Sequence, residues 1–89
     1  MEIDFTTQIW KEGKMYVSYA KELDVSSCGK TIKEAKKNLI EAVECFLETA
    51  EEMGTLDQIL EEAGFMKKRN VWKSPQVISM EKTRIAIPG

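Results

Sequence analysis

Two cysteines, Cys28 and Cys45, carry the most reactive side chains in this sequence. The sequence offers neither of them a partner residue for catalysis or for metal binding. The sequence contains no histidine, which excludes Cys-His and Ser-His nucleophile pairs, imidazole general bases and His-ligated zinc. Two cysteines are also too few and too far apart for a metal knuckle. Because cytoplasmic thiols stay reduced, we expect no structural disulfide. The sequence therefore predicts no catalytic residue, no metal site and no cofactor.

Charge is segregated along the chain, although the net charge is only −2. Residues 41–62 contain no lysine or arginine but eight acidic residues, namely Glu41, Glu44, Glu48, Glu51, Glu52, Asp57, Glu61 and Glu62. Such a stretch is either the solvated face of a helix or a surface that attracts a basic, RNA-binding partner, and both can hold at once. The candidate partner-binding residues in it are Glu44, Glu48, Glu51 and Glu52.

The segment that follows is basic. Residues 66–84 contain Glu81 as their only acidic residue against Lys67, Lys68, Arg69, Lys73, Lys82 and Arg84. This segment is either a solvated connector or a weak contact for nucleic acid, in which Trp72 would stack on a base. Trp72 could equally fill the core.

Apolar residues alternate with period two near the N-terminus and predict two strands, residues 3–10 and 15–20. The two apolar faces would consist of Ile3, Phe5, Thr7 and Ile9 and of Met15, Val17 and Tyr19. A three-residue loop, residues 12–14, brings these faces together by pairing Ile9 with Val17. This register also pairs Trp10 with Tyr16 on the outer face. Such an aromatic pair is either a packed surface feature or a contact for a partner.

A short third strand, residues 25–28, precedes two predicted helices. Thr31 and Glu34 form a capping box, and apolar positions recur behind it at spacings of three and four: Ile32, Ala35, Leu39, Val43, Phe46 and Ala50. This pattern predicts a long helix that ends at Gly54. Thr55 and Gln58 form a second box before a shorter helix that ends at Gly64.

Residues 66–89 are predicted to be a β-rich extension, either part of the same domain as residues 1–65 or an oligomer contact. Residues 76–80 and 83–87 flank Glu81 and Lys82 as the strands of a hairpin would. Met80, Ile85 and Ile87 are too apolar to leave in water. We therefore expect them to contact another copy of the chain in a homodimer or a higher homo-oligomer.

Several short motifs follow one another in a specific order. A turn at Leu23-Asp24 and a short strand precede Gly29-Lys30-Thr31-Ile32-Lys33-Glu34-Ala35 and Asn38-Leu39-Ile40-Glu41-Ala42-Val43, and residues 60–65 are Leu-Glu-Glu-Ala-Gly-Phe. In this order and spacing, residues 1–65 resemble the HicB antitoxin family. The resemblance implies a partial RNase H-like fold, in which a small antiparallel sheet of three or four strands carries its helices on one face.

The resemblance also implies a partner. HicB proteins bind and silence HicA toxins, which are small, basic, RNA-cleaving proteins with a double-stranded-RNA-binding-like fold. Many HicB proteins add a C-terminal DNA-binding domain, but the residues after Phe65 are too few for a helix-turn-helix, so we do not expect direct DNA binding. Nuclease activity on an RNase H-like fold would need clustered carboxylates. Asp4 and Asp24 are the only aspartates near predicted strands, and we expect no enzyme.

The sequence thus predicts an α+β protein of three strands, two helices and a β-rich tail that acts as a HicB-like antitoxin by binding and occluding a HicA-type toxin. The alternative is a stand-alone, non-catalytic oligomeric binding or scaffold protein that associates with RNA. No apolar run is long enough to span a membrane, and the acidic N-terminus is unlike a signal peptide. We therefore expect a cytoplasmic protein with no membrane partner.

Overall fold

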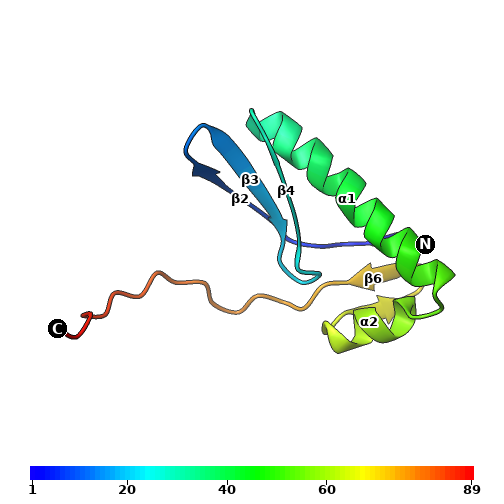
Figure 1. Ribbon diagram of the computed structural model, residues 1–89. Coiled ribbons are helices and arrows are strands. Elements are labelled where there is room, and N and C mark those ends of the chain that lie inside the picture. Colours follow the sequence, from blue (N-terminus) through cyan, green and yellow to red (C-terminus); the bar gives the residue numbers. More distant parts are fainter.

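Two three-stranded sheets and two helices make up the fold (Figure 1). The computed structural model describes residues 1–89. Along the chain the elements are β1 (Glu2–Ile3), β2 (Thr7–Glu12), β3 (Met15–Ala20), β4 (Val25–Gly29), α1 (Ile32–Glu52), α2 (Leu56–Glu62), β5 (Met66–Lys68) and β6 (Val71–Lys73). The first sheet is antiparallel, in the order β2-β3-β4, and in the second β6 lies between a parallel β1 and an antiparallel β5. The predicted α+β class is confirmed, with the strands divided over two sheets.

The hairpin of β2 and β3 has a register one residue away from the predicted one. Trp10 pairs with Val17 and Ile9 with Ser18. The cause is Gly13, whose φ of +59° suits the first central position of a two-residue hairpin turn. The predicted three-residue loop, and with it the pairing of Trp10 with Tyr16, was wrong.

This shift moves every side chain of β3 to the other face of the sheet. Ser18 and Ala20 are buried beneath α1, and the Ser18 hydroxyl donates a hydrogen bond of 2.7 Å to the Ala35 carbonyl. The residues predicted to face the core therefore lie on the outer face of the sheet: Met15, Val17 and Tyr19. At residues 18 and 20 only small side chains fit on the inner face of β3, because the helix lies close to it there.

The capping box places the start of α1 correctly. The Thr31 hydroxyl accepts a hydrogen bond of 3.0 Å from the Glu34 backbone N–H, while the Glu34 carboxylate accepts one from the Lys30 backbone N–H. The helix then approaches β4 so closely that a Cβ on Gly29 would lie 2.6 Å from the Ala35 backbone nitrogen. Glycine is therefore required at residue 29.

The core lies where α1 meets α2, the two sheets and the segments that join them. Its buried apolar residues are Ala20, Leu23, Leu39, Val43, Leu60, Phe65 and Trp72, and Phe46 and Leu47 pack against them. Four residues of the predicted stripe on α1 are buried, but Ile32 is exposed. The alternative in which Trp72 fills the core is confirmed, since this side chain is 3% exposed.

The second predicted capping box was wrong. Thr55 makes no side-chain cap to α2, and its hydroxyl donates instead to the Ala50 carbonyl of the preceding helix. The Gln58 side chain donates to Glu62. The turn between the helices is thus stabilised by a contact back to α1.

Residues 74–89 form an extended tail without helix or strand, which leads away from the rest of the chain (Figure 1). The predicted hairpin of residues 76–80 and 83–87 does not form, and the last strands of the chain are β5 and β6. An isolated two-stranded hairpin is marginal in water unless its apolar face packs against something. In this tail nothing covers that face, and Ile78, Ile85 and Ile87 are 86%, 80% and 91% exposed.

Candidate functional site

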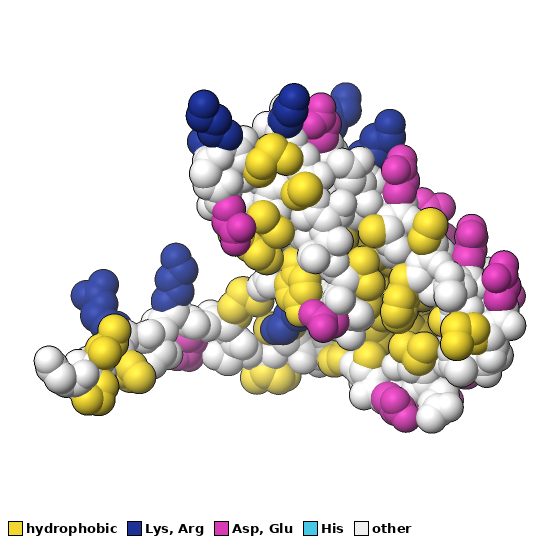
Figure 2. Space-filling model, viewed as in Figure 1, with side chains coloured by type: hydrophobic (Ala, Val, Ile, Leu, Met, Phe, Trp, Pro, Cys, Tyr) yellow, Lys and Arg dark blue, Asp and Glu magenta, His cyan; other side chains and the backbone are white.

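Five glutamates follow one another at helical spacing along α1. These residues, here termed the acidic face, are all exposed: Glu41, Glu44, Glu48, Glu51 and Glu52. Figure 2 shows acidic side chains in a row along this edge of the molecule. The acidic face unites the four glutamates that the sequence suggested as partner-binding residues.

No cation of the chain neutralises the acidic face. The one salt bridge joins Lys73 Nζ to Asp4 Oδ2 at 3.0 Å, and the last turn of α1 contains no basic residue. Glutamates three or four positions apart repel one another, and negative charge at the C-terminal end of a helix opposes the helix dipole. The acidic face therefore lowers the stability of its own helix.

Lysines gather at the opposite end of α1. Lys33, Lys36 and Lys37 lie in its first two turns and are exposed, although positive charge at a helix N-terminus is also unfavourable. In Figure 2 the basic side chains lie at the top of the view and the acidic row descends from them. The side-chain charges thus add to the helix dipole, and α1 carries a charge gradient from basic to acidic along its length.

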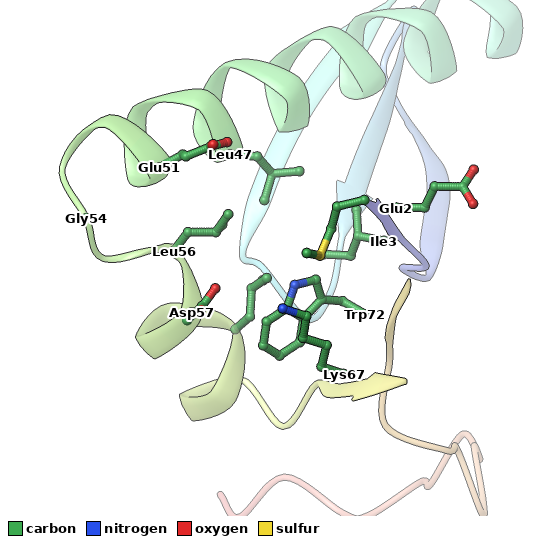
Figure 3. A pocket seen from close by; sticks show the side chains of 11 residues that line it. Glu2, Ile3, Leu47, Glu51, Gly54, Leu56, Asp57, Lys67 and Trp72 are labelled. Atoms are coloured by element: carbon green, nitrogen blue, oxygen red, sulfur yellow. The ribbon is translucent and has the colours of Figure 1, made fainter. Parts of the chain in front are cut away.

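A hollow of about 530 Å³ adjoins the acidic end of α1, bounded by α2 and the sheet β1-β6-β5. In Figure 3, Leu47, Leu56 and Trp72 converge on it, with Glu51 and Asp57 at its rim. Glu2 and Ile3 line the opposite side, where the Glu2 carboxylate points outwards. Glu51 belongs to both the acidic face and the hollow, so the two surfaces are continuous.

Trp72 contributes an unsatisfied hydrogen-bond donor among the residues that line this hollow. Its indole N–H is buried and has no partner within the chain, and Lys67 Nζ lies 5.7 Å from the centroid of its ring. A buried N–H without an acceptor is unfavourable. The hollow combines an apolar lining with an acidic rim, which suits a basic side chain with an aliphatic stem on a segment of polypeptide.

Trp10 and Tyr16 lie on opposite faces of the sheet. Trp10 packs edge-on against Tyr19, with ring centroids 6.2 Å apart, and its Nε1 donates a hydrogen bond to Glu12 Oε1. Tyr16 lies on the helix side, where Lys11 Nζ is 5.7 Å from its ring centroid. The outer face does carry an aromatic pair, but its second member is Tyr19.

Tyr19 also makes the one contact in the chain that clearly shifts a pKa. Its hydroxyl donates a hydrogen bond of 2.8 Å to Asp24 Oδ1, and this bond, with smaller contributions from desolvation and the Asp24 charge, raises the pKa of Tyr19 above 10.0. Since the folded-state pKa is the higher one, the contact stabilises the fold below the unfolded-state pKa, and this contribution disappears as the pH rises through the folded-state value.

Replacing Asp24 with Asn should lower the pKa of Tyr19 towards its ordinary value. Asp24 has a φ of +55°, and Asn tolerates this left-handed conformation, so the turn should be preserved. Ultraviolet absorbance of the phenolate, followed as a function of pH, measures the change. Identical titration curves for both proteins would show that the bond does not persist in solution.

The two aspartates considered for metal chemistry are engaged separately. Asp4 pairs with Lys73, and Asp24 accepts the Tyr19 hydrogen bond. No group of three or more cysteines, aspartates or glutamates is arranged to hold a metal ion. Cys28 and Cys45 are both free and exposed.

Sequence reasoning missed most of the hollow. Leu47 directly follows Phe46 and falls outside the predicted apolar stripe, and this additional apolar residue beside the acidic run was the available signal. Asp57 was part of the acidic stretch of the sequence, but its place beside the hollow, like that of Leu56, depends on how α2 folds back from α1.

Comparison with known proteins finds no match to this chain among protein-family models, curated sequences or solved structures. Neither helix combines the length and the apolar character that crossing a bilayer requires.

Proposed function

We propose that this chain is a HicB-like antitoxin that binds a small, basic, RNA-cleaving protein of the HicA type and covers its RNA-cleaving surface. The observation that carries the proposal is the unneutralised acidic face of α1. An RNA-cleaving protein needs basic side chains to hold phosphates, and a row of carboxylates offers those side chains an alternative partner. Occupying them with carboxylates would exclude RNA.

The placement of the acidic face supports binding over simple solvation. A solvated helix gains stability from alternating charges and from basic residues near its C-terminus. In α1 both preferences are reversed, and Glu51 and Glu52 stand in the last turn without a cation. A surface that lowers the stability of its own helix is expected where the charge serves a partner.

The hollow gives this partner a place to anchor. Charges on a surface mainly accelerate encounter and select the partner, whereas buried contacts hold a complex together. A lysine or arginine of the partner can lay its stem along Leu47 and Leu56 and direct its charge to Glu51 and Asp57. The order of motifs from Leu23 to Val43, which resembles that of HicB proteins, is the reason for proposing a partner of the HicA type.

Recovery of the full chain with its partners from its native cell tests the proposal. We expect a small basic protein at a stoichiometry near one to one, RNA cleavage by that protein after separation, and loss of cleavage when the chain is added back. A partner that does not cleave RNA, or one that cleaves equally well with the chain bound, would contradict the proposal.

The alternative function, an RNA-associated binding protein, is favoured by one observation. Exposed lysines surround the hairpin and the start of α1 (Figure 2), namely Lys11, Lys14, Lys30, Lys33, Lys36 and Lys37. The same preparation distinguishes the two functions, because under this alternative the chain would carry RNA in place of a basic protein.

A further inference from the structure

β2 is an edge strand whose outer side pairs with nothing. In the sheet β2-β3-β4 it bonds only to β3. The Lys21 backbone N–H donates to the Thr6 carbonyl, so in this antiparallel ladder the even-numbered residues of β2 bond to β3 and the odd-numbered ones do not. Thr7, Ile9 and Lys11 therefore direct their backbone N–H and C=O groups to the open edge.

A groove runs beneath this edge on the helix side of the sheet. It has a volume of about 600 Å³, and its apolar lining includes Ile9 on β2, Tyr16 on β3 and Ile32 on α1. Lys11 and Lys36 add positive charge to it. Because α1 lies over β3 and β4 more than over β2, this part of the sheet is left uncovered, and Ile32 is 49% exposed.

The tail, residues 74–89, pairs with no strand of its own chain. It is extended and leads away from the sheets (Figure 1). In residues 81–87 the side chains alternate, so that Glu81, Ile85 and Ile87 share one side while Lys82, Arg84 and Ala86 share the other. Ile85 and Ile87 are 80% and 91% exposed, so their apolar side has no cover within the chain.

We propose that the tail of one copy adds as a strand to the β2 edge of a second copy, and that the two copies exchange tails reciprocally. Ile85 and Ile87 then enter the groove beside Ile9 and Ile32. Strand addition supplies backbone hydrogen bonds to both unpaired edges, and the groove accepts the side chains on one side of the added strand. A two-fold exchange closes the assembly with one self-complementary contact.

The charges of the tail match the two faces of β2. With Ile85 and Ile87 in the groove, Glu81 also lies on the groove side, where Lys11 and Lys36 stand. Lys82 and Arg84 lie on the outer side of the sheet, together with Glu12. Both faces therefore bring opposite charges together. If the tail were turned over, with Ile85 and Ile87 on the outer side, both faces would bring like charges together.

The second copy is favoured over the chain's own β2 by the course of the tail. Pro75 lies against Gly64, at 2.9 Å from where a Cβ of that glycine would be, and beyond it the tail diverges from the β2-β3-β4 sheet. In Figure 1 the C-terminus lies far from β2. A neighbouring molecule can meet the tail along this course, whereas the chain's own β2 cannot without a change of direction at Pro75.

Variants on each side of the contact test the proposal by sedimentation of the full chain at micromolar concentration. The unchanged protein should be a dimer. Replacing both Ile85 and Ile87 with Asp should give a monomer, and so should Lys11→Pro, which removes a donor at the free edge but none of the bonds to β3. Ala86→Asp, on the outer side of the tail, is the matched control and should remain a dimer.

Mixing then distinguishes exchange from other causes of dissociation. The Asp variant keeps its β2 edge and the Lys11→Pro variant keeps its tail, so an equimolar mixture should form a dimer with one molecule of each. Circular dichroism verifies that each variant is folded. If Lys11→Pro is not, Thr7→Pro replaces it, since this residue also directs its N–H to the open edge. Because this mixed dimer keeps one of the two exchanged tails, it should form at a higher concentration than the unchanged dimer, and a mixture that stays monomeric well above that concentration overturns the proposal.

Amide hydrogen exchange locates the contact. In the unchanged protein the amides of Ile9 and Lys11 should exchange at least tenfold more slowly than in the Asp variant, because only strand addition protects these outward-directed groups. A dimer in which they exchange rapidly would place the interface elsewhere. A monomer in which they are protected would mean that the tail pairs within its own chain, and either result refutes exchange.

Discussion

Replacing Glu44, Glu48, Glu51 and Glu52 together with Gln is expected to slow association with the proposed basic partner by at least about tenfold at low salt, because opposite charges raise association rates by 10 to 10³. The salt dependence of the rate should flatten, since it arises from the charges removed. Stopped-flow fluorescence or surface plasmon resonance, repeated over a range of ionic strength, measures both effects.

The same replacement is expected to stabilise the free protein. Each repulsive pair at a spacing of three or four costs about 0.2–0.5 kcal/mol, and each acidic residue in the last turn costs about 0.3–1 kcal/mol at low salt. The free energy of unfolding should therefore rise by roughly 1–4 kcal/mol at neutral pH and low salt. Denaturant titration measures it, and a gain in stability together with a loss of association rate separates a binding surface from a merely solvated one.

A matched control uses the same change of charge on α2. Glu51 and Glu52 are compared with Glu61 and Glu62, since both pairs are exposed and adjacent and each loses two negative charges on replacement by Gln. We expect the pair on α1 to have the larger effect on the association rate. Equal effects would mean that only the net charge matters, and an unchanged rate for the fourfold variant would leave the acidic face as solvated surface alone.

The sequence predicted the local features of the fold well where one signal acted alone. The capping box at Thr31 and the apolar spacing behind it located α1 and its buried residues, because helix periodicity is fixed by geometry. The acidic face followed from the same periodicity. These features depend on residues within a few turns of one another and need no knowledge of tertiary contacts.

The hairpin register could not be predicted from apolar alternation, because both faces of β3 carry plausible core residues. The structure buries Ser18 and Ala20 because α1 approaches β3 and β4 closely, as the fit at Gly29 shows. Larger side chains such as Tyr19 then remain on the outer face. The register depended on a helix that follows later in the sequence, and only the turn at Gly13 signalled it locally.

The hollow and the tail depend on contacts between residues that lie still farther apart in the sequence. Trp72 reaches the core because β6 pairs with β1, which joins the two ends of residues 2–73. No periodicity links segments so far apart. The tail was predicted to form a hairpin because its apolar residues do alternate as in a strand. Such alternation does not show whether the strand pairs within its own chain or with another copy.

Replacing Leu39 with Ala is expected to lower the free energy of unfolding by about 2–5 kcal/mol, through lost apolar burial and the cavity left behind. Leu39 is 1% exposed and lies in the core with Leu60 and Trp72. A loss of this size is a large part of the stability of a small domain. Chemical denaturation followed by circular dichroism measures it.

The control for this change is the next residue along the same helix. Ile40 is 53% exposed, and Ala is the better helix former, so Ile40→Ala should leave the free energy of unfolding within about 0.5 kcal/mol of its original value. The two variants remove similar apolar side chains from adjacent positions, and only their burial differs. Equal losses for both would mean that Leu39 and Ile40 are equally buried in solution, which would contradict the orientation of α1 on which the acidic face depends.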